Sequence, residues 1–270
     1  MSAPNLEHFL AYAQKYKSTL SEPQYSVEAI IAIYERAILY GDDHLYTDPY
    51  LLVQLASGAQ GACFLHLEDW NTNDLEMIAG RPVLDIILNY PPHIQVALLD
   101  ALYYHINLIE GILPTEEYQF EGVGSEKSLQ RAKTLIELAD IKRGNKVAIV
   151  GLIVDILRMA LDKEAEVRVA DLAESGKSIC GINIEHNAMP LLDWADVVII
   201  TGNTLKTNTS EQLLKAASKN SLNVLVYSMT GHNIAPRYID YGANVVTCET
   251  FPYYWYANTP SKMRVYKKQR

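Results

Sequence analysis

Three short runs rich in Val and Ile constrain the fold of this chain more than any other feature. They are KVAIVG at 146–151, EVRVAD at 166–171 and DVVIITG at 196–202. A helix-period segment follows the first run, a polar interval the second, and another helical pattern the third. Continuous apolar strands alternating with helices are typical of parallel strands buried on both faces. The sequence therefore predicts an α/β fold with a doubly wound, mostly parallel sheet, which NVLVYS at 223–228 and Asn244–Thr247 extend.

The first part of the chain mixes helical and strand-like patterns. Helical spacing over 5–20 predicts an amphipathic helix, and residues 94–106 predict a helix that is apolar nearly all round. Asp100 stands out as the one charged residue of that second helix. The run at 27–40 suits either a buried helix or a strand, and its pattern leaves both open.

A looser stretch at 114–124, with Pro, Gly and several Glu, suggests a boundary between two domains. We expect a smaller α+β domain at 1–120 and the parallel-sheet domain at 121–270. Ser125 is expected to cap a helix over 126–139, and residues 208–211 fit a capping box.

Composition excludes several classes of partner. The chain has 49% hydrophobic and 20% charged residues and a formal net charge of −9, which argues against nucleic acid or an anionic membrane. The one basic cluster is at the end of the chain, where we expect a solvated terminus. No signal-peptide pattern or membrane-length apolar run is seen, and three widely spaced cysteines fit a reducing cytoplasm.

Ligands of doubly wound sheets bind beyond the carboxyl ends of the strands, so polar residues there are the candidate site. Gly151, followed about 20 residues later by Asp171, has the outline of a nucleotide site. The turn GLIVDI lacks the second and third glycines of the dinucleotide fingerprint, which makes NAD an unlikely ligand. A ligand resembling S-adenosylmethionine is less constrained by that pattern.

The third strand ends in a string of hydroxyl and amide side chains before a helix. Such groups can receive a carboxylate or phosphate, or they can simply cap a helix and shape a loop. The candidate ligand-binding residues here are Thr201, Gly202, Asn203, Thr204, Asn208 and Thr209, with Ser228 at the end of the fourth strand.

His232 follows the fourth strand in a glycine-containing loop and is a candidate general base or metal ligand. A second possible metal site joins the polar loop Asp42-Asp43-His44 with His66 and Glu68, although two unrelated polar edges explain these residues better. The aromatic segment Tyr253–Tyr256 suggests core packing or a dimer contact.

The run ADVVIITGNTLKTNTSEQLL resembles a motif of the Rossmann-like proteins known as the "putative heavy-metal chelation" family, whose function is unknown. VAIVG and the strand ending at Asp171 are similar to that family's first two strands, and AGRPVLDI and ALLDAL to its N-terminal partner domain. The resemblance implies an enolase-N-terminal-like domain before a Rossmann-like one, with a ligand site in a cleft between them. The family's motif positions correspond to Thr201, Gly202, Thr204, Asn208 and Thr209 of this chain, and more loosely to Gly151, Asp171 and Pro236, which the resemblance implies are site residues. It also implies that 27–40 is at least partly strand.

Three functions remain open. The first is a cytoplasmic small-ligand-binding protein that holds a metal or a metal-binding metabolite. The second is an enzyme of small-metabolite metabolism that uses a nucleotide-like or S-adenosylmethionine-like cosubstrate. A scaffold that dimerises through its aromatic end is a third possibility. The sequence does not identify the ligand, and a transition metal is the cofactor that the resemblance suggests.

Overall fold

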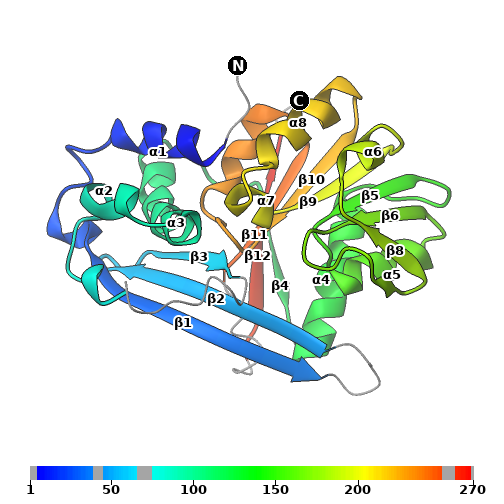
Figure 1. Ribbon diagram of the computed structural model, residues 1–270, viewed down its shortest axis with the longest axis horizontal. Helices are drawn as coiled ribbons and strands as arrows, with labels where there is room; N and C mark the ends of the chain where they lie inside the picture. Colours follow the sequence, from blue (N-terminus) through cyan, green and yellow to red (C-terminus); the bar gives the residue numbers. More distant parts are fainter. Residues whose placement is uncertain (1–4, 39–44, 66–74, 251–258, 269–270) are drawn as a thin grey trace.

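The computed structural model describes residues 5–38, 45–65, 75–250 and 259–268, which form two sheets with surrounding helices (Figure 1). The smaller sheet has the order β1-β2-β3, and the larger has the order β4-β12-β11-β10-β9-β5-β6-β8-β7. The result is a mixed α/β protein with one large, mostly parallel sheet.

The small sheet is an antiparallel meander of β1 (Val27–Ile38), β2 (Leu45–Leu55) and β3 (Gln60–Phe64). The ambiguous run at 27–40 is thus a strand over its described part, as the family resemblance implied. Its Ile and Val residues suit a strand because β-branched side chains pack well on a pleated surface.

Helices cover one face of this small sheet. The helix α3 (Pro92–Ile109) lies against β3, β2 and α1 (Leu6–Gln14), and its apolar circumference is explained by this burial. In the sequence, β3 and α3 are separated by α2 (Val83–Ile86) and two short 3-10 helices, Leu75–Met77 and Ile87–Asn89. A further 3-10 helix, Pro23–Tyr25, precedes β1.

The large sheet is organised around β5 (Lys146–Val150), as the three apolar runs predicted. On one side of β5 lie β6 (Glu166–Ala170), β8 (Ile182–Glu185) and the two-residue β7 (Ser178–Ile179). On the other side lie β9 (Val197–Thr201), β10 (Asn223–Ser228) and β11 (Val245–Glu249). The strand order therefore reverses between β5 and β9, and ligands bind at such points in open α/β sheets.

The basic end of the chain is a paired strand and not a free terminus, although Lys262 stays exposed to solvent. The basic residues Lys262, Arg264 and Lys267 belong to β12 (Ser261–Lys267), which pairs antiparallel with β11. β12 in turn pairs with β4 (Glu116–Phe120), where Lys262 and Lys267 contact the acidic residues Glu117 and Glu116. A strand therefore runs through the looser stretch at 114–124, and it adds to the edge of the large sheet.

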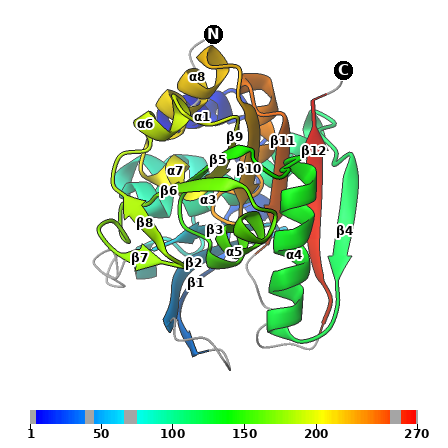
Figure 2. The same cartoon turned by 90° about the vertical axis from the view of Figure 1, so that its right-hand side faces the viewer.

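Both faces of the large sheet are covered by helices (Figure 2). Val147 and Ile149 of β5 pack with α4 (Gly124–Leu138) and α5 (Val154–Asp162), while Ala148 and Val150 face the opposite layer. That opposite layer contains α6 (Met189–Leu192), α7 (Asn203–Lys206), α8 (Ser210–Lys219) and the 3-10 helix η5 (Ala235–Tyr241). Its apolar core is continuous with the core around α1 and α3.

Two expected helix caps are wrong. The N-cap of α4 is Val123, whose backbone N–H donates to the Glu126 carboxylate, so Ser125 lies inside the first turn. The N-cap of α8 is Thr209, which makes no side-chain capping bond. Glu211 instead accepts from Asn5 and pairs with Lys215, because α1 lies close enough to compete for its carboxylate.

Among the helices of the described ranges, none combines the length and apolar character that crossing a bilayer requires.

Candidate functional site

Most of the predicted site residues lie at one edge of the large sheet. Thr201 and Ser228 end β9 and β10, while Gly151 and Asp171 directly follow β5 and β6. The carboxyl ends of neighbouring parallel strands meet at one edge, which brings these residues together as predicted.

Gly151 and Thr201 meet across the point where the strand order reverses. Gly151 has a φ of +89°, and a Cβ atom added there would lie 2.0 Å from Oγ1 of Thr201. Only glycine allows this turn and this approach. The Thr201 hydroxyl is buried, with its residue 7% exposed, and has no hydrogen-bond partner among the described residues. A buried hydroxyl without a partner is costly and needs an explanation.

Asp171 holds the loops beside this turn. Its Oδ2 accepts from the backbone N–H of Leu152 at 2.8 Å, and its Oδ1 accepts from Ala173 and Glu174 at 2.8 and 3.0 Å. Three of the roughly four acceptor positions of the carboxylate are therefore filled by the chain itself. These bonds give Asp171 a structural role in shaping the turn.

Gly202 and Asn203 connect β9 to the loop after β10. A Cβ atom on Gly202 would lie 2.3 Å from Oγ of Ser228 and 2.4 Å from the carbonyl oxygen of Thr230, so the two segments are in close contact. Oδ1 of Asn203 accepts from the Thr230 hydroxyl at 2.8 Å. The side chain of Asn203 is half-buried.

The remaining hydroxyls of the motif mainly stabilise the connection between α7 and α8. Oγ1 of Thr204 donates to the Thr201 carbonyl at 2.8 Å, and the hydroxyls of Thr207 and Thr209 lie 3.0 Å apart. Asn208 has a φ of +57°, which Asn tolerates better than most residues. The geometry at these positions fits the interpretation that the residues shape a loop between two helices.

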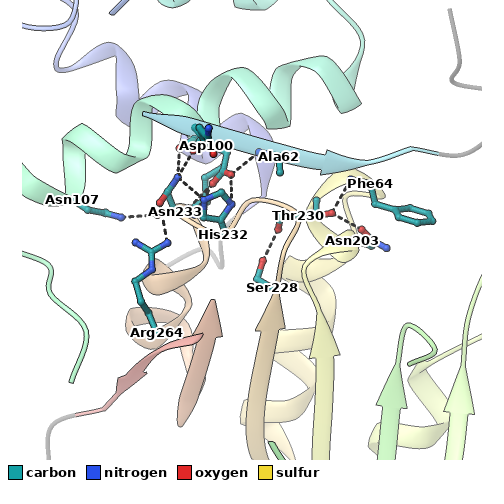
Figure 3. A network of polar contacts seen from close by, with 12 residues as sticks. Ala62, Phe64, Asp100, Asn107, Asn203, Ser228, Thr230, His232, Asn233 and Arg264 are labelled. Carbon is teal, nitrogen blue, oxygen red and sulfur yellow. Dashed lines mark hydrogen bonds and ion pairs between the residues drawn. The ribbon is translucent and has the colours of Figure 1, made fainter. Parts of the chain in front are cut away.

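His232 lies in the loop after β10, as predicted, and is buried between the two sheets (Figure 3). Its Nδ1 lies 2.9 Å from Oδ2 of Asp100 on α3. Its Nε2 lies 3.1 Å from Nδ2 of Asn233. A metal at His232 would have to displace one of these neighbours, and its role as a metal ligand stays a prediction.

Asp100 attaches the loop after β10 to the small sheet. Its side chain accepts from the backbone N–H groups of Ala62 at 2.9 Å, of Asn233 at 2.6 Å and of Ile234 at 3.3 Å. Asp100 is completely buried, and these charge-assisted bonds compensate for its burial. These hydrogen bonds explain why one charged residue, Asp100, is present in an otherwise apolar helix.

Asn233 extends the network to β3 and β12. Its amide nitrogen donates to the Gln60 carbonyl at 2.8 Å, and its amide oxygen accepts from Arg264 at 3.3 Å (Figure 3). Its backbone carbonyl accepts from Asn107 at 2.6 Å. The side chains of this network come from parts of the chain that are far apart in sequence.

A second polar cluster connects α1, α3 and η5. Glu110 accepts from the hydroxyls of Tyr12 and Tyr16 and pairs with Arg237, which also donates to Asn107. Burial alone would raise the pKa of Glu110, but the hydrogen bonds from Tyr16, Arg237 and Tyr12 together lower it. Two of the 18 tyrosines of the chain thus donate to one carboxylate.

Aromatic and apolar side chains border the carboxyl edge on the small sheet's side. The rings of Tyr50 and Phe64 meet edge to face with centroids 5.4 Å apart, and the Tyr50 hydroxyl lies 3.7 Å from Sδ of Met229. Nζ of Lys206 lies 6.0 Å from the Phe64 ring centroid, and the Phe64 N–H donates to the Thr230 hydroxyl at 2.9 Å.

The structure offers limited support for a metal site made by the chain alone. Within the described ranges, no three His, Cys, Asp or Glu side chains are grouped so that they can hold a metal ion. Burial raises the pKa of the Cys248 thiol to about 12, which disfavours the thiolate that a metal needs. The hypothesis on Asp42, Asp43, His44, His66 and Glu68, and that on Tyr253–Tyr256, fall outside the described residues.

Several important residues were missed by reasoning from the sequence. Phe64, Thr230, Asn233 and Arg264 show no spacing signal, because they act through contacts between distant segments. Asp100 did carry a signal, since a lone carboxylate in an apolar helix must find buried partners.

Comparison with known proteins agrees with this architecture. Residues 134–247 match the sequence profile of the DUF364 family, described as "putative heavy-metal chelation". A search of the curated proteins gave no match.

Two solved structures of the same family, both from proteins of unknown function, share the fold. The one from Desulfitobacterium hafniense has a TM-score of 0.61 and 12% identity, over 94% of this chain and 98% of its own. The one from Pyrococcus horikoshii has a TM-score of 0.55 and 14% identity, over 96% of this chain and 99% of its own. Residues 134–247 thus match the family that the strand and threonine motifs resemble.

Proposed function

We propose that this protein binds a small molecule at the carboxyl edge of β5 and β9, facing the small sheet, and that the ligand is a metal or a metal-binding metabolite. The observation that carries the proposal is the buried Thr201 hydroxyl beside Gly151, for which the described residues offer no hydrogen-bond partner. A ligand atom bound there would supply the missing hydrogen bond.

The strand order supports this location. The reversal between β5 and β9 is what a Rossmann-like domain has, and such sheets bind ligands there. We assign the N-terminal domain to the segment whose three antiparallel strands pack on α3, and the enolase-N-terminal-like fold to that domain. The network around Asp100 holds this domain against the loop after β10.

Three observations support a cytoplasmic binding protein that handles metals. The family description points to heavy metals. Cys63, Cys180 and Cys248 form no disulfide, which suits a reducing compartment. The aromatic and thioether groups of Tyr50, Phe64 and Met229 offer an apolar wall of the kind that small-molecule sites have.

A second candidate is an enzyme with a nucleotide-like or S-adenosylmethionine-like cosubstrate. The turn at Gly151 and the carboxylate of Asp171 favour it, because they occupy the positions of a turn and an acid in nucleotide sites. Asp171 already accepts three backbone hydrogen bonds, which leaves little capacity for a ribose hydroxyl.

Thermal unfolding of metal-stripped protein tests the location. The panel contains first-row transition metals, S-adenosylmethionine, NAD and ATP, and it is run on the wild type, Thr201→Val and Thr247→Val. Thr247 is a matched control, since its buried hydroxyl already donates to the Val226 carbonyl. A ligand at 100 times its dissociation constant adds about 2.7 kcal/mol of stability.

We expect at least one compound to stabilise the wild type and the Thr247 variant, and to stabilise Thr201→Val much less. Equal stabilisation of all three proteins would refute the proposed location. A shift with a nucleotide-like ligand that Asp171→Asn removes would favour the enzyme.

A further inference from the structure

The corner between Gly151, Thr201 and the start of α5 has a chemical character that points to a class of ligand. This step rests on the proposed function and concerns the same site. Thr201 contributes a buried hydroxyl whose oxygen lies beside Gly151. Immediately after that turn, α5 begins at Val154.

The first turn of α5 presents backbone N–H groups that no side chain of the described segments caps. Its N-cap residue is Ile153, and the helix has nine residues. The N–H groups of a first helical turn attract oxygen acceptors and negative charge. The Thr201 hydroxyl beside Gly151 has no partner in the described part of the chain, which is an independent sign that an acceptor belongs at this turn.

The carboxylates near this corner are directed elsewhere. Asp155, in the first turn of α5, accepts from the Ser128 hydroxyl on α4 at 2.5 Å and lies 3.8 Å from Arg158. Asp171 accepts from three backbone N–H groups. The described groups at the corner are therefore mainly hydrogen-bond donors, which suit an oxygen-bearing ligand better than a bare cation.

The turn also limits the size of the acceptor. Gly151 is followed by Leu152, Ile153 and Val154, whereas a diphosphate needs further glycines for its backbone approach. A single carboxylate makes smaller demands, because its two oxygens can be satisfied by one hydroxyl and one or two N–H groups.

We infer that the natural ligand is a small carboxylate-bearing metal chelate, with one carboxylate bound by Thr201 and the start of α5. The metal is held by the donor atoms of the ligand and not by a cage of protein side chains. This inference joins the family description to the absence of a metal-binding group among the described residues.

The two nearby aspartates add a charge preference. A free polycarboxylate carries several negative charges, which Asp155 and Asp171 repel, and binding of a divalent metal lowers that net charge. The metal-loaded chelate should therefore bind more tightly than the free chelator.

Isothermal titration calorimetry on metal-stripped full-length protein tests the inference. The probes are nickel nitrilotriacetate, free nitrilotriacetate, nickel chloride, citrate and its neutral trimethyl ester, each at up to millimolar concentration. The proteins are the wild type, Thr201→Val and the control Thr247→Val, with circular dichroism and thermal unfolding to confirm that each is folded.

We expect the nickel chelate to bind the wild type and the control alike, and more tightly than free nitrilotriacetate. Citrate should bind and its ester should not. Thr201→Val should lower the affinity for the nickel chelate about tenfold or more, since a hydrogen bond to a charged group is worth roughly 1.5–3 kcal/mol.

Three outcomes would overturn the inference: tight binding of nickel chloride alone, equal binding of the ester, or no binding of any carboxylate probe. The proposed function fails differently. If compounds of the thermal panel bind with no effect of Thr201→Val, the location is wrong. If a nucleotide-like compound binds and the substitution abolishes it, the location stands and only the ligand class is wrong.

Discussion

The carboxylate of Asp100 on α3 lies 2.9 Å from Nδ1 of His232 in the loop after β10, and neither residue is accessible to solvent to any useful extent. Asp100 also accepts from the backbone N–H groups of Ala62 and Asn233. The Asp100 carboxylate therefore connects the small sheet and the helix that covers it to the loop after β10.

Asp100→Asn should strongly destabilise the protein. The amide has one acceptor oxygen instead of two and turns its NH2 group toward buried donors, so we expect a loss of about 3 kcal/mol of unfolding free energy. Urea denaturation measures the loss. A double-mutant cycle with His232→Ala should give a coupling energy well above the ~0.5 kcal/mol seen for independent sites. Additive effects would show that the two side chains are not energetically coupled.

Gly151→Ala should destabilise the fold through one identified contact. The new Cβ would lie 2.0 Å from the Thr201 hydroxyl, and a left-handed φ alone costs an L-residue roughly 1–2 kcal/mol. We expect chemical denaturation to show a total loss of about 3 kcal/mol of unfolding free energy, because the steric clash adds to the backbone strain. Thr201→Ala in the same chain should recover part of the loss. No recovery would mean that the strain, and not the contact, determines the cost.

Thr201→Val should leave the unliganded protein equally stable or more stable by about 1 kcal/mol, because it removes a buried polar group that no described residue satisfies. Thr247→Val should instead lose about 1 kcal/mol, because it breaks the bond to the Val226 carbonyl. Parallel urea titrations of the two variants measure the difference. Clear destabilisation by Thr201→Val would indicate that its hydroxyl already has a structural partner.

Glu110 should make the protein sensitive to acid. Burial alone would raise its pKa, but the bonds from Tyr16, Arg237 and Tyr12 outweigh burial, and the net folded-state pKa is below the usual value of 4.5. A lowered folded-state pKa gives stability that is present above the unfolded-state pKa and is lost as pH falls through the folded-state pKa.

The wild type should therefore lose more unfolding free energy between pH 7 and pH 3.5 than Glu110→Gln does, as measured by urea denaturation at each pH. Both proteins carry the other carboxylates, so their difference isolates Glu110. Identical pH profiles would show that Glu110 contributes no acid-sensitive stability.

Local pattern was a good guide to the central strands and a poor one to the edges. The apolar runs at 146–150, 166–170, 197–201 and 223–228 coincide with β5, β6, β9 and β10. The basic end of the chain and the acidic stretch before α4 gave no such signal. They form β12 and β4 because each gains a strand partner and opposite charges from the other.

The candidate site shows the same division. The sequence placed Gly151, Asp171, Thr201, Gly202 and Ser228 at the ends of strands, and parallel strands must bring those ends together. It could not show that Asp171 accepts hydrogen bonds from backbone N–H groups. Nor could it show that the Thr201 hydroxyl has no hydrogen-bond partner among the described residues. Those differences depend on side-chain packing between neighbouring loops.

The sequence by itself determined the alternation of buried strands and helices, and with it the edge of the sheet that carries the polar residues. These features follow from residue order, because apolar periodicity and turn residues act over a few neighbours. Only the tertiary structure decided that Asp100 meets His232, that Arg264 contacts Asn233 and that the Thr201 hydroxyl finds no partner within the described ranges. Such contacts join segments far apart in the chain, and their existence depends on strand order and packing that no local pattern encodes.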